Sequence, residues 1–255
     1  MMLTDTHTHI YSEAFKEDQK AMMERAIDAG VKRFFVPAVD SETTQAMYDV
    51  EKAFPNEVFL MMGLHPTHVK ENFKEELKHV EEELSKRKFY AIGEIGMDLY
   101  WDKTYVNEQK EAFEQQIIWA KKYKLPIVIH CRDAFDEVFE VLEKHKSSDL
   151  FGIFHCFTGN HEQALRAIDC GMKLGIGGVV TFKNGKIDKF LDQIPLKNIV
   201  LETDAPYLAP TPFRGKRNES SYLLNVAQKL AEIYSVSVGE IAKVTTQNSK
   251  NVFGI

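Results

Sequence analysis

Two histidines that are two residues apart, His7 and His9, close a short apolar stretch at the start of the chain. If that stretch is a β-strand, both side chains point to the same side, because successive residues of a strand face opposite ways. Two imidazoles on one side can bind one metal ion, since histidine is the commonest metal ligand. The spacing also fits two solvated histidines at a polar strand end. Residues elsewhere in the chain decide between the two interpretations.

Further candidate ligands come at the ends of other apolar stretches. The segments are "GLHP" with His65, "GEIGMD" with Glu94, "VIHCRDA" with His130 and Arg132, "HCFTG" with His155, and "LETDAPYLAP" with Glu202 and Asp204. Polar side chains buried at strand ends are costly unless they are paired or coordinated. Nitrogen and carboxylate ligands without thiolate suit zinc, manganese or magnesium. The pattern therefore favours a metal centre over solvated histidines.

Six of these side chains make up the predicted ligand set, namely His7, His9, Glu94, His130, His155 and Asp204. Six ligands are too many for one catalytic zinc that keeps an open position. They suit two metal ions that share a bridging carboxylate. Such ions lie roughly 3.5–4 Å apart and clamp the attacking and leaving oxygens of a displacement. The prediction is therefore a centre of two divalent ions, with Zn, Mg or Mn as candidates.

These ligands need a fold that brings the ends of many strands together. Eight short, near-continuously apolar stretches alternate with helical patterns, at 3–5, 33–38, 58–65, 90–96, 126–131, 151–157, 173–178 and 199–203. Such stretches are typical of strands that are covered on both faces. Between them, Phe135, Val138, Phe139 and Leu142 form the buried stripe of a helix. The alternation predicts an α/β fold.

We expect this α/β fold to be a single (β/α)8 TIM-like barrel, because eight strands alternate with helices in about 250 residues. No linker or break in composition divides the chain, so residues 1–255 are predicted to form one metal-dependent hydrolase barrel domain. The alternative is an open, doubly wound sheet. In a barrel, the chemistry sits at the C-terminal ends of the strands, which is where the candidate ligands lie.

Composition limits the partners. The formal net charge is −6, which excludes a broad basic surface for gripping duplex DNA. A phosphate substrate is still compatible with this charge, because bound metals supply positive charge locally. The three cysteines form no CxxC pair, and no apolar run approaches the length of a signal peptide core or a membrane helix. We therefore expect a cytoplasmic monomer with no membrane partner and no obligate protein partner.

Taken in order, "DTHTH", "GLHP", "GEIGMD", "LPIVIHCRDA", "HCFTG" and "LETDAPYLAP…RGKRNE" resemble the TatD-type metal-dependent deoxyribonucleases, a branch of the amidohydrolase-like metal-dependent hydrolases. The resemblance runs over almost the whole chain. It implies a TIM-like barrel with a binuclear divalent metal site. It further implies that His7, His9 and Asp204 bind one ion, that His130 and His155 bind the second, and that Glu94 bridges the two.

Other polar residues have predicted roles around the ligands. Asp204 is the candidate general base, because it lies beside the nucleophile, and with Glu94 it forms the predicted catalytic pair. Glu202 is expected to orient a ligand histidine. The candidates for substrate binding are His65, Arg132 and Arg214. Tyr100 and Trp101 follow the Glu94 stretch and could stack on a nucleic-acid base or pack against neighbouring helices.

The predicted function is hydrolysis of DNA phosphodiester bonds by a metal-activated water at the binuclear centre. The negative charge favours single strands or 3′ ends over a long duplex, so exonuclease-like action is expected on DNA, or on RNA. A second hypothesis keeps the metals but assigns a small molecule or an aminoacyl-tRNA ester as the substrate. A third is a non-catalytic barrel that binds nucleic acid. The absence of a lysine where Glu94 stands and the basic group at 214–217 favour phosphate.

Overall fold

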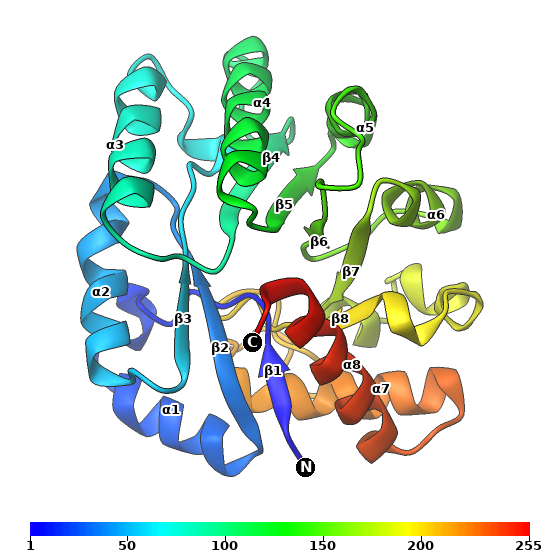
Figure 1. The fold of residues 1–255 in the computed structure, drawn as a ribbon. Helices are drawn as coiled ribbons and strands as arrows, with labels where there is room; N and C mark the ends of the chain where they lie inside the picture. Colours follow the sequence, from blue (N-terminus) through cyan, green and yellow to red (C-terminus); the bar gives the residue numbers. More distant parts are fainter.

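The computed structural model describes residues 1–255, in which eight parallel strands alternate with helices (Figure 1). The strands are β1 (Leu3–Asp5), β2 (Val31–Pro37), β3 (Val58–Met61), β4 (Ile92–Asp98), β5 (Ile127–Arg132), β6 (Gly152–Phe154), β7 (Met172–Ile176) and β8 (Ile199–Leu201). The α-helices are α1 (Gln19–Asp28), α2 (Thr44–Ala53), α3 (Phe73–Lys86), α4 (Val106–Tyr123), α5 (Phe135–Lys144), α6 (His161–Asp169), α7 (Leu223–Tyr234) and α8 (Val238–Phe253). None of them is both long and apolar enough to cross a bilayer.

The strands form two sheets, β1-β2-β3 and β4-β5-β6-β7-β8, which backbone hydrogen bonds join into one barrel. At one seam, the N–H of Gly93 donates to the carbonyl of Met62 at 3.0 Å. At the other, the N–H of Asp204 donates to the carbonyl of His7 at 2.9 Å. The closed barrel confirms the (β/α)8 prediction, and the doubly wound alternative is wrong. Closure also places the first strand, β1, next to the last strand, β8, so that His7 lies beside Asp204.

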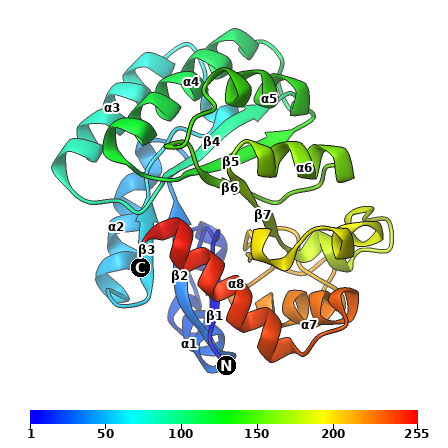
Figure 2. The same ribbon diagram turned by 45° about the vertical axis from the view of Figure 1, so that its right-hand side comes forward.

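The interior of the barrel is filled by a small apolar cluster, which lies below the ligands. Its members are Phe35, Met61, Ala91, Val128, Ile153, Val200, Val252 and Phe253. Helix α8 runs across β1 and β8 (Figures 1 and 2), and its Phe253 ring stacks on Phe35 with centroids 3.6 Å apart. His130 comes two residues after Val128 on β5, and His155 comes two residues after Ile153, directly beyond the end of β6. Strand alternation therefore points these histidines into the same interior, one layer higher.

Several strands end earlier than the sequence predicts: β7 and β8 end two residues early, and the difference is larger for β3 and β6. β3 ends at Met61 and β6 at Phe154, whereas the apolar stretches run to residues 65 and 157. The apolar pattern continues because Leu64 and Phe157 remain buried in the core after the strand ladder has ended. His65 and His155 therefore lie on the loops that leave the strands.

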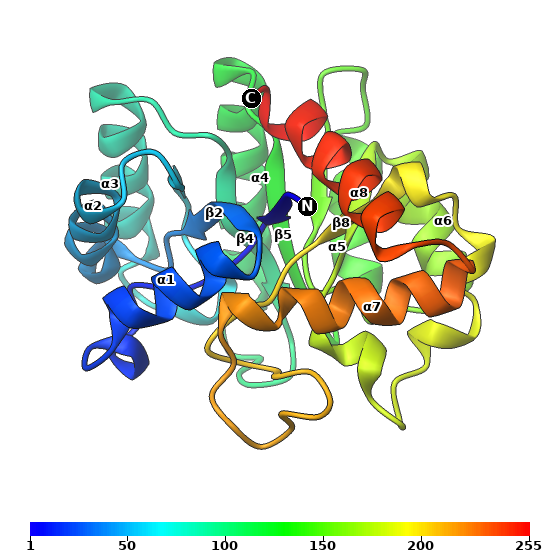
Figure 3. The same cartoon turned by 90° about the horizontal axis from the view of Figure 1, so that it is seen from below.

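The connections on either side of β8 are irregular. Between β7 and β8 the chain forms short 3-10 helices, η4 (Gly178–Thr181), η5 (Ile187–Lys189), η6 (Leu191–Gln193) and η7 (Leu196–Asn198), in place of an α-helix. After β8, a long loop projects from the body of the barrel before α7 begins (Figure 3). This loop carries Asp204 at its start and Arg214 further along, so it supplies groups to the C-terminal face of the barrel.

Candidate metal centre

Glu94 lies at the middle of the predicted ligand set, and its side chain is 2% exposed. Its two carboxylate oxygens face different groups of histidines. Oε2 lies 3.1 Å from His7 Nε2 and 3.6 Å from His9 Nε2. Oε1 lies 2.9 Å from His130 Nδ1 and 3.6 Å from His155 Nε2. A carboxylate with one oxygen toward each group has the arrangement that a bridge between two ions requires.

An irregularity in β4 points Glu94 inward. The pairing of β4 with β5 shifts register between Ile92 and Ile95. Both isoleucines join the larger core that packs against the helices, although three residues separate them. Strict alternation would put them on opposite faces. The shift turns Glu94 to the interior together with Gly96, where a Cβ atom would lie 2.0 Å from the carbonyl oxygen of His130.

Asp204 completes the cluster from the loop after β8. Its Oδ1 lies 3.5 Å from His9 Nε2 and 3.9 Å from both His7 Nε2 and His155 Nε2. The rings of His7 and His155 stack with centroids 3.5 Å apart. His7 is fully buried, and its Nδ1 has no hydrogen-bond partner. The Nε2 atom of His7 faces both carboxylates, so these imidazoles and the two carboxylates in so small a volume form a donor set that fits divalent metal ions.

Two further carboxylates orient the histidines from outside the cluster. Asp98 Oδ2 lies 2.9 Å from His130 Nε2, and Glu202 Oε1 lies 2.9 Å from His155 Nδ1. A carboxylate takes the ring proton on its own side, so the lone pair of the other ring nitrogen points to the centre. Glu202 therefore lies where an orienting residue must lie. Sequence reasoning missed Asp98, although its spacing of four residues from Glu94 on a strand was a usable signal.

His65 also contacts the centre, but its ring carries the proton on the nitrogen that a metal-binding histidine would leave free. Its Nδ1 accepts hydrogen bonds from the Thr67 N–H at 3.1 Å and from Thr67 Oγ1 at 2.7 Å. The ring proton of the neutral side chain is therefore on Nε2, which lies 3.3 Å from Glu94 Oε1. An Nε2–H group is a donor and cannot bind a metal ion. This state suits contact with a negatively charged oxygen.

The electrostatics of the centre are dominated by burial and by these contacts. Burial alone would raise the pKa of Glu94, but its charge interactions with His65, His7 and His155 hold that pKa well below the usual range. Burial lowers the pKa of His155, yet Glu202 and Glu94 raise it to about 10. For His65 burial dominates, and its pKa falls to about 4. Glu94 thus stays ionised and requires positive charge beside it.

The predicted substrate-binding arginines are exposed, and both lie at the end of the barrel that carries the centre, Arg132 at the end of β5 and Arg214 on the loop after β8. The Arg132 guanidinium carbon lies 3.7 Å from the centroid of the Tyr100 ring, and that of Arg214 lies 3.6 Å from the centroid of the Phe182 ring. By contrast, Arg217 pairs with Asp18 at 2.6 Å, although it follows Arg214 closely in sequence. The sequence analysis names only Arg214 as a substrate-binding candidate, but the ion pair of Arg217 joins segments that are distant in the sequence and could not be predicted from it.

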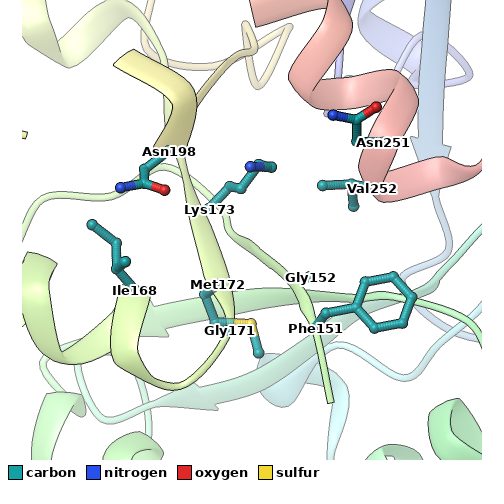
Figure 4. Close-up of a pocket in the computed structure, with 9 residues that line it drawn as sticks. All are labelled: Phe151, Gly152, Ile168, Gly171, Met172, Lys173, Asn198, Asn251 and Val252. Carbon is teal, nitrogen blue, oxygen red and sulfur yellow. The ribbon is translucent and has the colours of Figure 1, made fainter. Parts of the chain in front are cut away.

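A hollow of about 270 Å³ opens elsewhere, where β6 and β7 begin. Gly152, Lys173 and Asn251 are among the nine residues that line it (Figure 4). None of the predicted site residues takes part, and the Lys173 ammonium donates to the carbonyl of Lys197 at 2.8 Å. The hollow is therefore separate from the candidate metal centre.

A (β/α)8 barrel with histidine and carboxylate side chains gathered at the C-terminal ends of its strands defines a metal-dependent hydrolase. The model of the TatD related DNase family matches residues 4–254, and the chain belongs to that family. It is 41% identical to the metal-dependent hydrolase YabD of Bacillus subtilis, with all of both chains covered. It is 31% identical to the metal-dependent hydrolase YcfH of Escherichia coli, over 100% of this chain and 97% of the other.

Solved structures agree with this assignment. The crystal structure of YjjV, a TatD homolog from Escherichia coli K12, superposes with a TM-score of 0.93 at 30% identity, covering 99% of this chain and 98% of the other. A TatD family hydrolase from Entamoeba histolytica has the same fold, with a TM-score of 0.85 at 20% identity over 99% of this chain and 98% of the other. The resemblance that the sequence motifs indicate is thereby confirmed.

Asp98→Asn should weaken metal binding about 10- to 100-fold. The Asp98 carboxylate accepts from the N–H groups of Tyr100 and Trp101 through Oδ1 and faces His130 through Oδ2. An asparagine whose Oδ1 still accepts from the Tyr100 and Trp101 N–H groups must point its NH₂ group toward His130 Nε2. This favours the His130 tautomer with the proton on Nδ1, the nitrogen that must bind the ion. Competition with a chelator measures the affinity. Asp102→Asn, in the same loop, is the matched control, and equal affinities for the two variants would contradict the assignment.

His65→Ala should keep the metal content of the wild type and lose turnover, whereas His130→Ala should lose bound metal. The reason is the protonated Nε2 of His65, which donates and does not coordinate. Elemental analysis of the purified variants measures the number of ions per chain. His65→Gln supplies an N–H group near the same place and should recover part of the activity. Loss of metal from His65→Ala equal to that from His130→Ala would make His65 a ligand.

Proposed function

We propose that the protein hydrolyses phosphodiester bonds of DNA, at single strands or 3′ ends, with two divalent ions bound in this centre. His7, His9 and Asp204 would hold one ion, His130 and His155 the other, and Glu94 would bridge them. The two-sided contacts of Glu94 support this division, because its Oε2 faces His7 and its Oε1 faces His130. The description of the matching family model, TatD related DNase, supports DNA as the substrate.

The choice of a phosphate substrate rests on one observation, namely which arginines form ion pairs and which do not. Of the seven arginines in the sequence, four form ion pairs with carboxylates: Arg25, Arg87, Arg166 and Arg217. The other three, Arg33, Arg132 and Arg214, have no carboxylate within 4.0 Å. Arg33 lies near the start of β2, whereas Arg132 ends β5 and Arg214 lies on the loop after β8, at the end of the barrel that carries the centre. Each of these last two is held by stacking on an aromatic ring, so its N–H donors stay free. Free guanidinium groups beside a hydrolytic centre suit the bidentate recognition of phosphate.

The residues divide the reaction among them. Bound divalent ions polarise a phosphoryl oxygen and lower the pKa of water toward neutrality. Asp204 accepts the proton of the attacking water, because its ionised carboxylate lies at the edge of the cluster and is 14% exposed. His65 donates its Nε2–H to a phosphate oxygen. Arg132 and Arg214 bind the flanking phosphates and position the chain across the centre.

Metal-stripped protein should leave a labelled single-stranded DNA oligonucleotide intact, and added Mg²⁺, Mn²⁺ or Zn²⁺ should restore shortening from one end. The label stands at the 5′ end in one reaction and at the 3′ end in the other, so the products give the polarity directly. His130→Ala protein, purified in the same way, controls for contaminating nuclease. Intact DNA with every metal, in wild-type protein shown to hold two ions, would overturn the proposal in favour of a small-molecule or aminoacyl-ester substrate.

Arg214→Ala should lower kcat/KM for the oligonucleotide by about 10- to 100-fold, the loss expected for one charged hydrogen bond to phosphate. Most of the change should fall on KM and should shrink at high salt. Lys216→Ala is the matched control, because it removes one exposed positive charge from the same loop. Equal effects of the two substitutions would mean that the loop acts only through its net charge.

A further inference from the structure

Three aromatic side chains of this protein are exposed, and all of them lie on loops that leave the barrel beside the metal centre. They are Tyr100 and Trp101 after β4 and Tyr207 after β8. Trp101 is 69% exposed and Tyr100 is 52% exposed, so neither is packed under a neighbouring helix. Every other phenylalanine, tyrosine and tryptophan is at least half buried. A tryptophan that is so exposed beside a site is suited to bind a flat, apolar group of a ligand.

The metal centre and this aromatic pair share one carboxylate. Asp98 Oδ1 accepts hydrogen bonds from the backbone N–H of Tyr100 at 3.0 Å and of Trp101 at 3.1 Å. The other oxygen of Asp98 lies 2.9 Å from His130 Nε2. The backbone that carries the indole is therefore held in place relative to a predicted metal ligand, as a substrate-binding segment must be.

Arg132 supports the aromatic pair from β5. It lies two residues after His130, and its guanidinium carbon is 3.7 Å from the centroid of the Tyr100 ring and 5.1 Å from that of Trp101. The two rings meet edge to face, with centroids 4.9 Å apart and planes at 87°. The arginine thus covers the face of Tyr100 and leaves the indole of Trp101 open. We call Tyr100, Trp101 and Arg132 the stacking platform.

We propose that the stacking platform binds the base of a nucleotide next to the scissile phosphodiester, with the base on the indole of Trp101 and a backbone phosphate on Arg132. This inference rests on the proposed function and names the feature of the substrate that the site selects. Aromatic rings bind bases of any sequence by stacking, and a neighbouring cation adds to the affinity. A base inside a duplex is already stacked on its neighbours. The platform therefore selects unpaired bases, as in single strands and frayed ends.

The test compares a single-stranded oligonucleotide with variants of it that lack one base. In each variant, one of the two nucleotides at the cleaved end carries only the sugar ring. Wild-type protein should prefer the base-bearing end by about 5- to 150-fold in kcat/KM. Trp101→Ala should remove this preference, because it lowers kcat/KM on the base-bearing end and leaves the abasic end unchanged. Trp101→Phe should keep most of it.

Ile118→Ala is the matched control, since Ile118 is 48% exposed on α4, outside the platform. Equal losses on base-bearing and abasic substrates in Trp101→Ala would show a structural role, and no loss on either would show that no base binds there. Either result overturns the inference.

Binding gives a second readout that does not depend on turnover. A dinucleotide with a methylenephosphonate linkage, which resists hydrolysis, should quench the fluorescence of Trp101 in the metal-loaded protein. Trp119, the other tryptophan, is 5% exposed and supplies an unquenched background. The quench should be absent in Trp101→Ala. If wild-type protein cleaves none of these oligonucleotides, the proposed function fails, and the quench alone decides whether the platform binds a base. Absence of a quench in wild-type protein overturns the platform.

Discussion

A carboxylate that is 2% exposed inside a barrel is unfavourable by several kcal/mol unless positive charge surrounds it. Glu94 is that group, and five imidazoles lie within 3.6 Å of its oxygens: His7, His9, His65, His130 and His155. They come from the ends of four strands or the loops that follow them, since His7 and His9 both follow β1. Only a closed barrel brings so many strand ends to one point. The fold and the site therefore depend on each other. The buried carboxylate requires the histidines around it, and only the closed barrel brings those histidines together.

A second layer of acids makes this arrangement specific. Asp98 and Glu202 each face the outer nitrogen of one histidine. Asp5 is fully buried at the seam between β1 and β8, where it accepts from the Thr203 N–H at 2.9 Å and from Thr203 Oγ1 at 2.6 Å. Burial raises the pKa of Asp5 to about 7, against the hydrogen bonds from Thr203. Asp5 thus locks the start of the chain to the loop that carries Asp204, a role that its position beside His7 in the sequence did not reveal.

The sequence was sufficient for the barrel and for the grouping of the ligands, because apolar strands, polar strand ends and motif order are local patterns. It was insufficient where contacts between distant segments decide. The tautomer of His65 depends on the turn at Thr67, and the inward direction of Glu94 depends on a register shift against β5. The ion pair of Arg217 with Asp18 and the stacking of Arg214 on Phe182 likewise join distant segments. The assignment of each ligand to one of two ions, and of residues 1–255 to one domain, stays a prediction.

Charge decides how a polyanion can approach this molecule. The formal net charge is −6, and two divalent ions carry four positive charges, so the protein as a whole stays negative even when both are bound. At physiological salt such charges are screened beyond about 8 Å. Attraction must therefore act at short range, at the ions and at the unpaired guanidinium groups of Arg132 and Arg214. A long duplex would lay many phosphates on a negative surface and gain little from so small a positive area. A chain end exposes few phosphates and can place its last base on Trp101, so local geometry rather than long-range attraction sets the specificity.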